Sequence, residues 1–186
     1  MLKYWVFAIL IPCCICVLPS VLVGPGSWMV IHVEQCVDNE KYPFQFVFNR
    51  RKVNRTHDGF SGYIYLDRDL DETFGVRVDI CKHVDGGCKP TAVLEDDCYC
   101  NFAEKYAKEN VEDCLINSMG MSPPLCPIPA GNHTISNYVF NYAELPEQGM
   151  YGQFGVDLYI MDGDEDIGCV HLTVNFENRD DLVNLG

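Results

Sequence analysis

Positive charge is scarce in this sequence. Lys and Arg together number 13 against 27 Asp and Glu, which gives the chain of 186 residues a formal net charge of -14. A surface this acidic repels phosphate backbones and anionic lipid headgroups, so nucleic-acid binding is excluded as a main activity. Apolar residues make up 48% and charged residues 22% of the chain, a balance that favours one folded domain of ordinary size over disorder.

Long apolar runs are also rare, and the one that stands out lies at the N-terminus, at residues 5–23. It follows a single lysine and is interrupted by two prolines, so we expect a secretory signal peptide at residues 1–24 rather than a membrane anchor. Residues 25–186 are then expected to form a single secreted, soluble domain. Two sequons in this domain predict N-glycosylation at Asn54 and Asn132.

Recognisable catalytic and metal-binding motifs are missing as well. The segment 59–62 lacks the second glycine of a nucleophile elbow at the required position, and none of the five histidines has a catalytic context. Asp162 begins a run that resembles half of a calcium loop, but Thr173 replaces its final acid, so we expect an acidic hairpin turn. The Cys-x-Cys at 98–100 could bind zinc, although disulfides are favoured in a secreted chain. We therefore expect no catalytic residue, metal or cofactor; an unrecognised carboxylate pair is the enzymatic alternative.

Cysteine, by contrast, is abundant. Three of the 11 cysteines lie in the expected signal peptide, and the remaining eight predict four disulfides formed in an oxidising compartment. Cys81 and Cys88 enclose a glycine-containing turn, so a local bond is expected there. A bond between Cys36 and Cys169 would tie the two ends of the domain together. The other four would staple a helical segment in nested or crossed pairings: Cys98, Cys100, Cys114 and Cys126.

Apolar and polar residues alternate over most of the chain. Such alternation indicates strands with one buried and one solvated face, which is typical of antiparallel sheets. Turns at 58–59 and 162–163 separate some of these strands, and the pattern as a whole predicts a mostly β protein, a β-sandwich. The predicted strands are 28–35, 44–48, 63–66, 74–80, 138–142, 154–160 and 170–176.

One segment, 97–117, departs from this period. Its apolar residues recur four positions apart, as in the pair Phe102 and Tyr106, which predicts a helical insert. We expect the helix to break near Asn110 and to end before Gly120.

Aromatic and β-branched residues gather on the apolar faces of the predicted strands. They would either fill an ordinary core or line a cavity for an apolar ligand, and periodicity leaves both arrangements open. The candidate cavity-lining residues are Phe44, Phe46, Phe48, Val76, Val78, Tyr138, Phe140, Tyr142, Phe154, Val156 and Leu158.

Several short motifs follow one another in the last third of the chain. They are Cys126-Pro127, Gly131-Asn132-His133-Thr134, Leu145-Pro146, Gly152-Gln153-Phe154 and Ile167-Gly168-Cys169. Together with the Cys81-x6-Cys88 turn, this order resembles the ganglioside activator branch of the ML lipid-recognition superfamily. Within that branch the chain is most similar to insect chemosensory proteins of the CheB type.

The resemblance implies an immunoglobulin-like antiparallel β-sandwich that opens into an apolar cup, where the family binds lipids without chemistry. It also implies the pairings Cys36–Cys169 and Cys81–Cys88. The chain departs from the family in the insert, because its Cys-x-Cys stands at 98–100 rather than just before Pro127.

We therefore expect a secreted, non-enzymatic carrier of a lipid or long-chain hydrophobic molecule, such as a contact pheromone. Its protein partner would be a membrane receptor or a lipid hydrolase. The alternative is an interaction module with a filled core, acting as an accessory to a receptor or glycolipid hydrolase. Saturable binding of a fluorescent fatty acid would distinguish the two.

Overall fold

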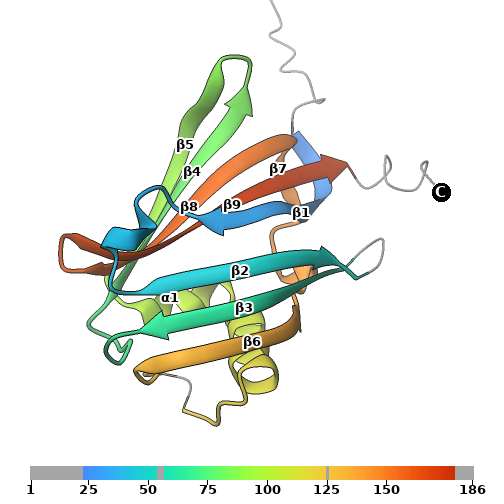
Figure 1. Ribbon diagram of the computed structural model, residues 1–186. Helices are drawn as coiled ribbons and strands as arrows, with labels where there is room; N and C mark the ends of the chain where they lie inside the picture. The colour runs from blue at the N-terminus through green and yellow to red at the C-terminus, as the bar shows by residue number, and fades with distance from the viewer. Residues whose placement is uncertain (1–22, 54–56, 125, 179–186) are drawn as a thin grey trace, which may run out of the picture.

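Two antiparallel β-sheets and a helical insert make up the computed structural model, which describes residues 23–53, 57–124 and 126–178 (Figure 1). The strands are β1 (Val23–Gln35), β2 (Gln45–Lys52), β3 (Asp58–Leu66), β4 (Gly75–Val84), β5 (Gly87–Asp96), β6 (Gly131–Val139), β7 (Gln148–Met150), β8 (Gly152–Asp162) and β9 (Glu165–Asn178). The six-stranded sheet has the order β5-β4-β8-β9-β1-β7, and the three-stranded sheet the order β2-β3-β6. The mostly β sandwich predicted from alternation is confirmed.

The insert between β5 and β6 consists of three short helical pieces. They are α1 (Tyr99–Tyr106), α2 (Lys108–Asp113) and the π-helical turn η2 (Cys114–Ser118). Two 3-10 turns lie elsewhere, η1 (Asn39–Lys41) and η3 (Tyr142–Glu144). The helical prediction for 97–117 is confirmed, but the break falls at Ala107, whose φ of -152° and ψ of 32° leave the helical region. Asn110, where the break was expected, lies inside α2.

Strand register explains the core of the larger sheet. Val76 of β4 lies opposite Ile160 of β8, and Val78 lies opposite Leu158, so the apolar residues of neighbouring strands share one face. The hairpin between β8 and β9 turns at Gly163, which has a φ of +60°, as the predicted turn at 162–163 requires. The alternation in these strands thus creates one continuous apolar surface.

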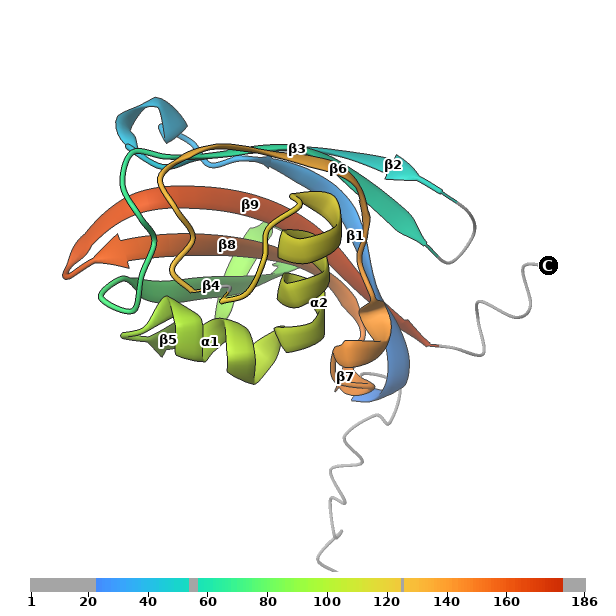
Figure 2. The ribbon, with the colours of Figure 1, turned by 90° about the horizontal axis from the view of Figure 1, so that it is seen from below.

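The sheets lie close together on one side and apart on the other. β1 of the larger sheet contacts β2 of the smaller one, and β9 also contacts β2. On the opposite side the helical insert lies between the sheets (Figure 2): α1 contacts β4 and β5, while η2 contacts β6. The fold is therefore a cup whose open side is covered by helices rather than by another strand.

Three details of the strand prediction are wrong. Asp58 and Gly59, expected in a turn, begin β3. The strand predicted at 138–142 is instead β6 at 131–139, because the chain leaves the sheet after Val139 and coils into η3. β5 was missed because it is an edge strand with nearly every residue exposed, so neither face shows a hydrophobic pattern.

The expected signal peptide falls mostly on residues 1–22, which lie outside the described residues. Val23 and Gly24, the last two residues of that prediction, pair with Met150 and Gly149 at the start of β1. The boundary at residue 24 thus stays a prediction. Among the described residues, no helix has the length and apolar character needed to cross a lipid bilayer.

Candidate functional site

The candidate cavity-lining residues meet in the space between the sheets. Five of them are buried in one hydrophobic core: Phe44, Phe46, Val76, Val78 and Tyr138. Five more are partly buried and packed against that core: Phe48, Phe140, Tyr142, Val156 and Leu158. Three of these ten, Phe44, Phe140 and Tyr142, lie outside the strands, so strand parity alone did not bring the group together. In this structure their side chains fill the inside of the cup.

Phe154 belongs to a different group of rings at one end of the larger sheet. Its ring centroid lies 5.9 Å from that of Trp28, which in turn lies 4.7 Å from Phe176. Tyr151 stacks on Phe176 at 5.6 Å, and the Trp28 Nε1 donates a hydrogen bond to the carbonyl of Pro146 at 2.9 Å. These aromatic contacts close the end of the sheet next to β7.

Tyr138 is fixed by its hydroxyl as well as by its ring. The hydroxyl donates to the side-chain oxygen of Asn110 at 2.8 Å, and the Asn110 Nδ2 donates to the carbonyl of Asn141 at 3.1 Å. The Asn110 backbone N–H donates to the Glu144 carboxylate at 3.1 Å. Burial, followed by the negative charges nearby, raises the pKa of Tyr138. Asn110 therefore ties α2 to the end of β6 and to η3.

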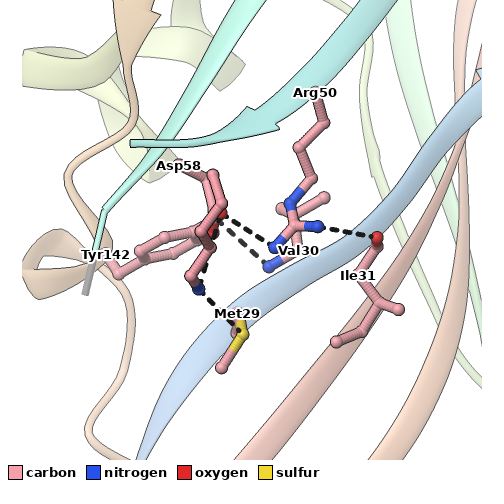
Figure 3. Close-up of polar contacts among 7 residues, drawn as sticks. Met29, Val30, Ile31, Arg50, Asp58 and Tyr142 are labelled. Carbon is pink, nitrogen blue, oxygen red and sulfur yellow. Dashed lines mark hydrogen bonds and ion pairs between the residues drawn. The ribbon is translucent and has the colours of Figure 1, made fainter. Parts of the chain in front are cut away.

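A buried carboxylate joins the two sheets on the closed side of the cup (Figure 3). Asp58 at the start of β3 forms ion pairs with Arg50 of β2 at 2.8 Å and with Lys52 at 3.6 Å. Its other oxygen accepts a hydrogen bond from the Tyr142 hydroxyl at 3.0 Å. That hydroxyl accepts a bond from the backbone N–H of Val30 in β1 at 3.1 Å. We call Arg50, Lys52, Asp58 and Tyr142 the junction cluster.

Further contacts connect the junction cluster to β1. Arg50 donates to the carbonyl of Ile31 at 3.1 Å, and the Lys52 ammonium lies 3.6 Å from the sulfur of Met29 (Figure 3). Burial is the main reason why the pKa of Tyr142 is raised. The sequence analysis missed this cluster because Asp58 looked like a turn residue. Four of the 13 basic residues lie within eight positions of Asp58 in the sequence, and that was the available signal.

Two pockets lie along the helical insert, and their lining contains none of the candidate cavity-lining residues. The larger, of about 490 Å³, lies between α2, η2 and the end of β6. It is an open and strongly acidic depression. Its carboxylates come from Glu109, Glu112, Asp113 and Glu144.

The smaller pocket, of about 270 Å³, is the more relevant to an apolar ligand. It lies beside the Cys100–Cys126 disulfide, and its lining combines Tyr99, Ala103 and Val111 with the charged side chains of Glu104, Lys108 and Glu112. Tyr99 and Val111 also pack against the core between the sheets. Burial raises the pKa of Tyr99 to about 12. The pocket thus connects the outside of the insert with side chains that contact the core. We call it the insert pocket.

Three disulfides form, rather than the four that were predicted. Cys36 pairs with Cys169 and Cys81 with Cys88, as expected. In the insert Cys100 pairs with Cys126, which excludes the nested arrangement. The remaining two insert cysteines, Cys98 and Cys114, carry free thiols, so the prediction that these two are disulfide-bonded is not met in this structure. The physical reason is their placement: Cys98 precedes α1, whereas Cys114 follows α2 and packs against the core.

Other side chains that could take part in catalysis or metal binding form structural contacts instead. The His171 Nδ1 lies 2.6 Å from the Asp157 carboxylate on the larger sheet. Within the described ranges, one group has potential metal-ligand atoms close together, namely Cys36, Asp157 and Cys169, and its two sulfurs are joined to each other. The Cys-x-Cys considered for zinc has one sulfur in a disulfide, so it lacks two free thiolates.

The two glycosylation predictions fall in different parts of the chain. Asn132 is exposed on β6, where a glycan would have room. Asn54 lies outside the described residues.

Comparison with solved structures finds a distant likeness of fold. The chain is similar to a solved structure of a Niemann-Pick type C2 protein from the Japanese carpenter ant, with 14% identity over 81% of this chain and 91% of that chain, and a TM-score of 0.28. No protein-family model and no curated protein sequence matches the chain. With identity and TM-score this low, the likeness does not establish a family.

Proposed function

We propose that this protein is a secreted, non-enzymatic carrier that holds a lipid or another long-chain hydrophobic molecule between its two sheets. The observation that carries the proposal is the construction of the cup. Two continuous apolar faces come together on one side, and on the other they are covered by a short, separately stapled helical insert. A cover of this kind can move without disrupting the hydrogen-bonded strands.

The interior is packed in this structure, so uptake of a ligand requires that side chains be displaced. Met119, Met121 and Phe102 are side chains that a ligand could displace, because they are only partly buried against the core. Methionine side chains adapt easily to a new neighbour. The insert pocket leads toward the same region through Tyr99 and Val111. We propose that the ligand enters there and lies against the candidate cavity-lining residues.

Burial of the ligand supplies the binding energy. Each methylene group removed from water contributes about 0.8 kcal/mol. A chain of about twelve carbons would therefore offset the cost of ordering and displacement with several kcal/mol remaining. The resemblance to the ganglioside activator branch of the ML superfamily supports a lipid as the ligand class. Its CheB-type members support a contact pheromone, with a receptor or lipid hydrolase as partner.

The proposal predicts that filling the cup abolishes binding. Leu158 points into the cup from β8, and Gln153 is exposed on the opposite face of the same strand. We expect Leu158→Trp to weaken binding of a fluorescent long-chain fatty acid at least tenfold, while Gln153→Trp leaves it unchanged. Circular dichroism would check that both variants fold, since overpacking costs about 1–3 kcal/mol. Equal affinities for both variants would contradict the proposed ligand position.

The packed interior also favours a second function, that of a filled interaction module serving a receptor or glycolipid hydrolase. The two functions differ in what the purified protein binds. Native mass spectrometry of the secreted protein would reveal a co-purifying lipid if it is a carrier. The absence of both a bound lipid and saturable fatty-acid binding would favour the interaction module.

A further inference from the structure

Two tyrosines of β3 are exposed on the outer face of the smaller sheet. Tyr63 is 39% exposed and Tyr65 is 42% exposed. Strand alternation places both on this face, because Ile64 and Leu66 point inward and pack in the core. In Figure 2 the smaller sheet is the outermost layer on its side of the molecule, with the insert and the larger sheet on its other side. We call Tyr63 and Tyr65 the tyrosine pair; together they present two aromatic rings to solvent.

One of the two expected glycosylation sites lies directly beside the tyrosine pair. In the register of β3 and β6, Tyr65 lies opposite Asn132 and Tyr63 lies opposite Thr134. Asn132 and Thr134 are the two residues that define the sequon, and both are exposed. Opposite residues of antiparallel strands have Cβ atoms about 4.5–5.5 Å apart. A sugar attached to the Asn132 side chain would therefore begin next to the ring of Tyr65.

The neighbouring polar side chains leave the space over Tyr65 to such a sugar. His133, the middle residue of the sequon, has the opposite strand parity, and its Nε2 lies 2.6 Å from the carbonyl oxygen of Pro129. On the other side of Tyr65, Gln45 of β2 is held by η1, because its side-chain amide donates to the carbonyl of Asn39 at 2.9 Å. Both side chains are thus engaged elsewhere.

We propose that the first sugar of an N-glycan on Asn132 packs against Tyr65 and covers the tyrosine pair. The faces of an N-acetylglucosamine ring carry C–H groups, whose partial positive charge suits the negative face of an aromatic ring. The contact also removes apolar surface of both partners from water. Because the sugar is covalently attached beside the ring, its effective concentration is high and the contact needs little affinity of its own.

Attachment of the glycan comes first, in the secretory pathway. The amide nitrogen of Asn132 attacks the anomeric carbon of a lipid-diphosphate-linked oligosaccharide. An N–C bond forms, the bond from that carbon to the diphosphate oxygen breaks, and the lipid diphosphate leaves with the bonding electron pair. The amide proton passes to a base of the transferring enzyme. The inference thus rests on the secretion assumed in the proposed function, but not on a bound lipid.

A double-mutant cycle on the full chain, secreted from mammalian cells, tests the contact. Every variant carries Asn54→Gln, so that Asn132 is the one remaining sequon asparagine. Glycopeptide mass spectrometry should find Asn132 occupied. Asn132→Gln should then raise the unfolding equilibrium constant, measured with urea, about threefold to tenfold when Tyr65 is present, and far less in Tyr65→Thr. An unoccupied Asn132, or the same effect of Asn132→Gln in both backgrounds, would overturn the proposal.

Tyr106 provides the matched control. It is 40% exposed and lies on α1, which contacts β4 and β5. In a Tyr106→Thr background, Asn132→Gln should have its full effect, because this ring does not meet the sugar. If Asn132→Gln is not secreted, enzymatic removal of the glycan from the folded protein makes the same comparison.

The rate of that enzymatic removal is a second readout, and it does not depend on stability. A peptide N-glycosidase must reach the bond between Asn132 and the first sugar. We expect it to release the glycan from folded Tyr65→Thr several-fold faster than from the protein with Tyr65, and Tyr106→Thr should not change the rate. Equal rates for all three proteins would mean that the glycan extends into solvent and leaves the tyrosine pair open to another molecule. Fatty-acid binding by the same samples tests the carrier function separately.

Discussion

Asp58 illustrates how a single buried charge can hold two sheets together. Its side chain is only 1% exposed, and it contacts two basic side chains and the Tyr142 hydroxyl. Through Tyr142 and Arg50 it is also connected to β1 in the other sheet. A buried carboxylate is tolerated only when such partners replace its water shell.

Removing this charge should destabilise the protein far more than removing an exposed one. Asp58→Asn leaves Arg50, which is 21% exposed, without its main partner, and we expect a loss of about 2–3 kcal/mol. Asp67→Asn is the matched control, because Asp67 is 43% exposed and its pair with Arg68 should contribute less than about 0.5 kcal/mol. Urea unfolding would measure both changes. Similar midpoints for the two variants would refute a role for Asp58 in joining the sheets.

Buried tyrosines make the stability depend on alkaline pH. The pKa of Tyr99 is raised by burial to about 12, above the value of about 10 expected in the unfolded chain. The stability linked to its proton is therefore complete below about pH 10 and is lost as the pH rises toward 12. We expect Tyr99→Phe to flatten this decline in the free energy of unfolding, whereas Tyr63→Phe, at a half-exposed position, should not. Urea unfolding at several pH values would measure the free energy of unfolding of both variants and of the unchanged protein. Equally steep declines in all three would contradict a role for the Tyr99 proton.

At the scale of elements, α2 depends on one side chain. The helix has six residues, too short to be stable alone. The Asn110 side chain bonds it to Tyr138 and Asn141, and its backbone N–H donates to Glu144. These contacts connect the insert to the smaller sheet. Loss of Asn110 should therefore loosen the cover of the cup and leave the strands intact.

We expect Asn110→Ala to lower the free energy of unfolding by about 1–3 kcal/mol, because the backbone N–H and carbonyl of Asn141 lose their side-chain partner and the Tyr138 hydroxyl keeps only the Asn110 carbonyl. Hydrogen exchange should accelerate in α1, α2 and η2 more than in β8 and β9. Asn117→Ala is the control, since Asn117 is bonded to the exposed Asp113. Uniform acceleration over the whole chain would show that the insert does not open on its own.

The elements that could be predicted from sequence are those with one buried face. β4, β8 and β9 alternate clearly, and their inner residues, such as Val78 and Leu158, were assigned correctly to the inside of the cup. β5 could not be found, because an edge strand that is exposed on both faces has no alternation. The rings at 138–142 alternate, but only Tyr138 is in a strand, and Tyr142 turns into η3 to reach Asp58.

The candidate site was less predictable than the strands. Periodicity identified which side chains face inward, yet it could not decide whether they touch. Phe154 has the same parity as Leu158, but it packs with Trp28 at the end of the sheet. The insert pocket depends on how the helices sit relative to the Cys100–Cys126 bond, a long-range arrangement that local patterns do not encode. Local patterns also could not show that Cys98 and Cys114 stay unpaired, because pairing depends on the same long-range arrangement.

At the scale of the whole molecule, the net charge of -14 determines which membranes the protein can approach. A carrier must collect and release its ligand at a lipid surface without remaining bound there. Repulsion between an acidic protein and anionic headgroups is strong at low ionic strength and is screened over about 10 Å at 0.1 M salt.

We therefore expect transfer of a fluorescent lipid from vesicles to the protein to depend on vesicle charge and salt. With phosphatidylserine-containing vesicles, transfer should be several-fold slower at 10 mM than at 150 mM salt, because screening removes the repulsion. With purely phosphatidylcholine vesicles, which carry no net charge, the rate should barely change with salt. Flotation of the vesicles would measure how much protein stays bound to them. Faster transfer or tighter retention on the anionic vesicles at low salt would contradict this prediction. It would mean that a local basic or apolar surface governs the encounter, rather than the overall charge.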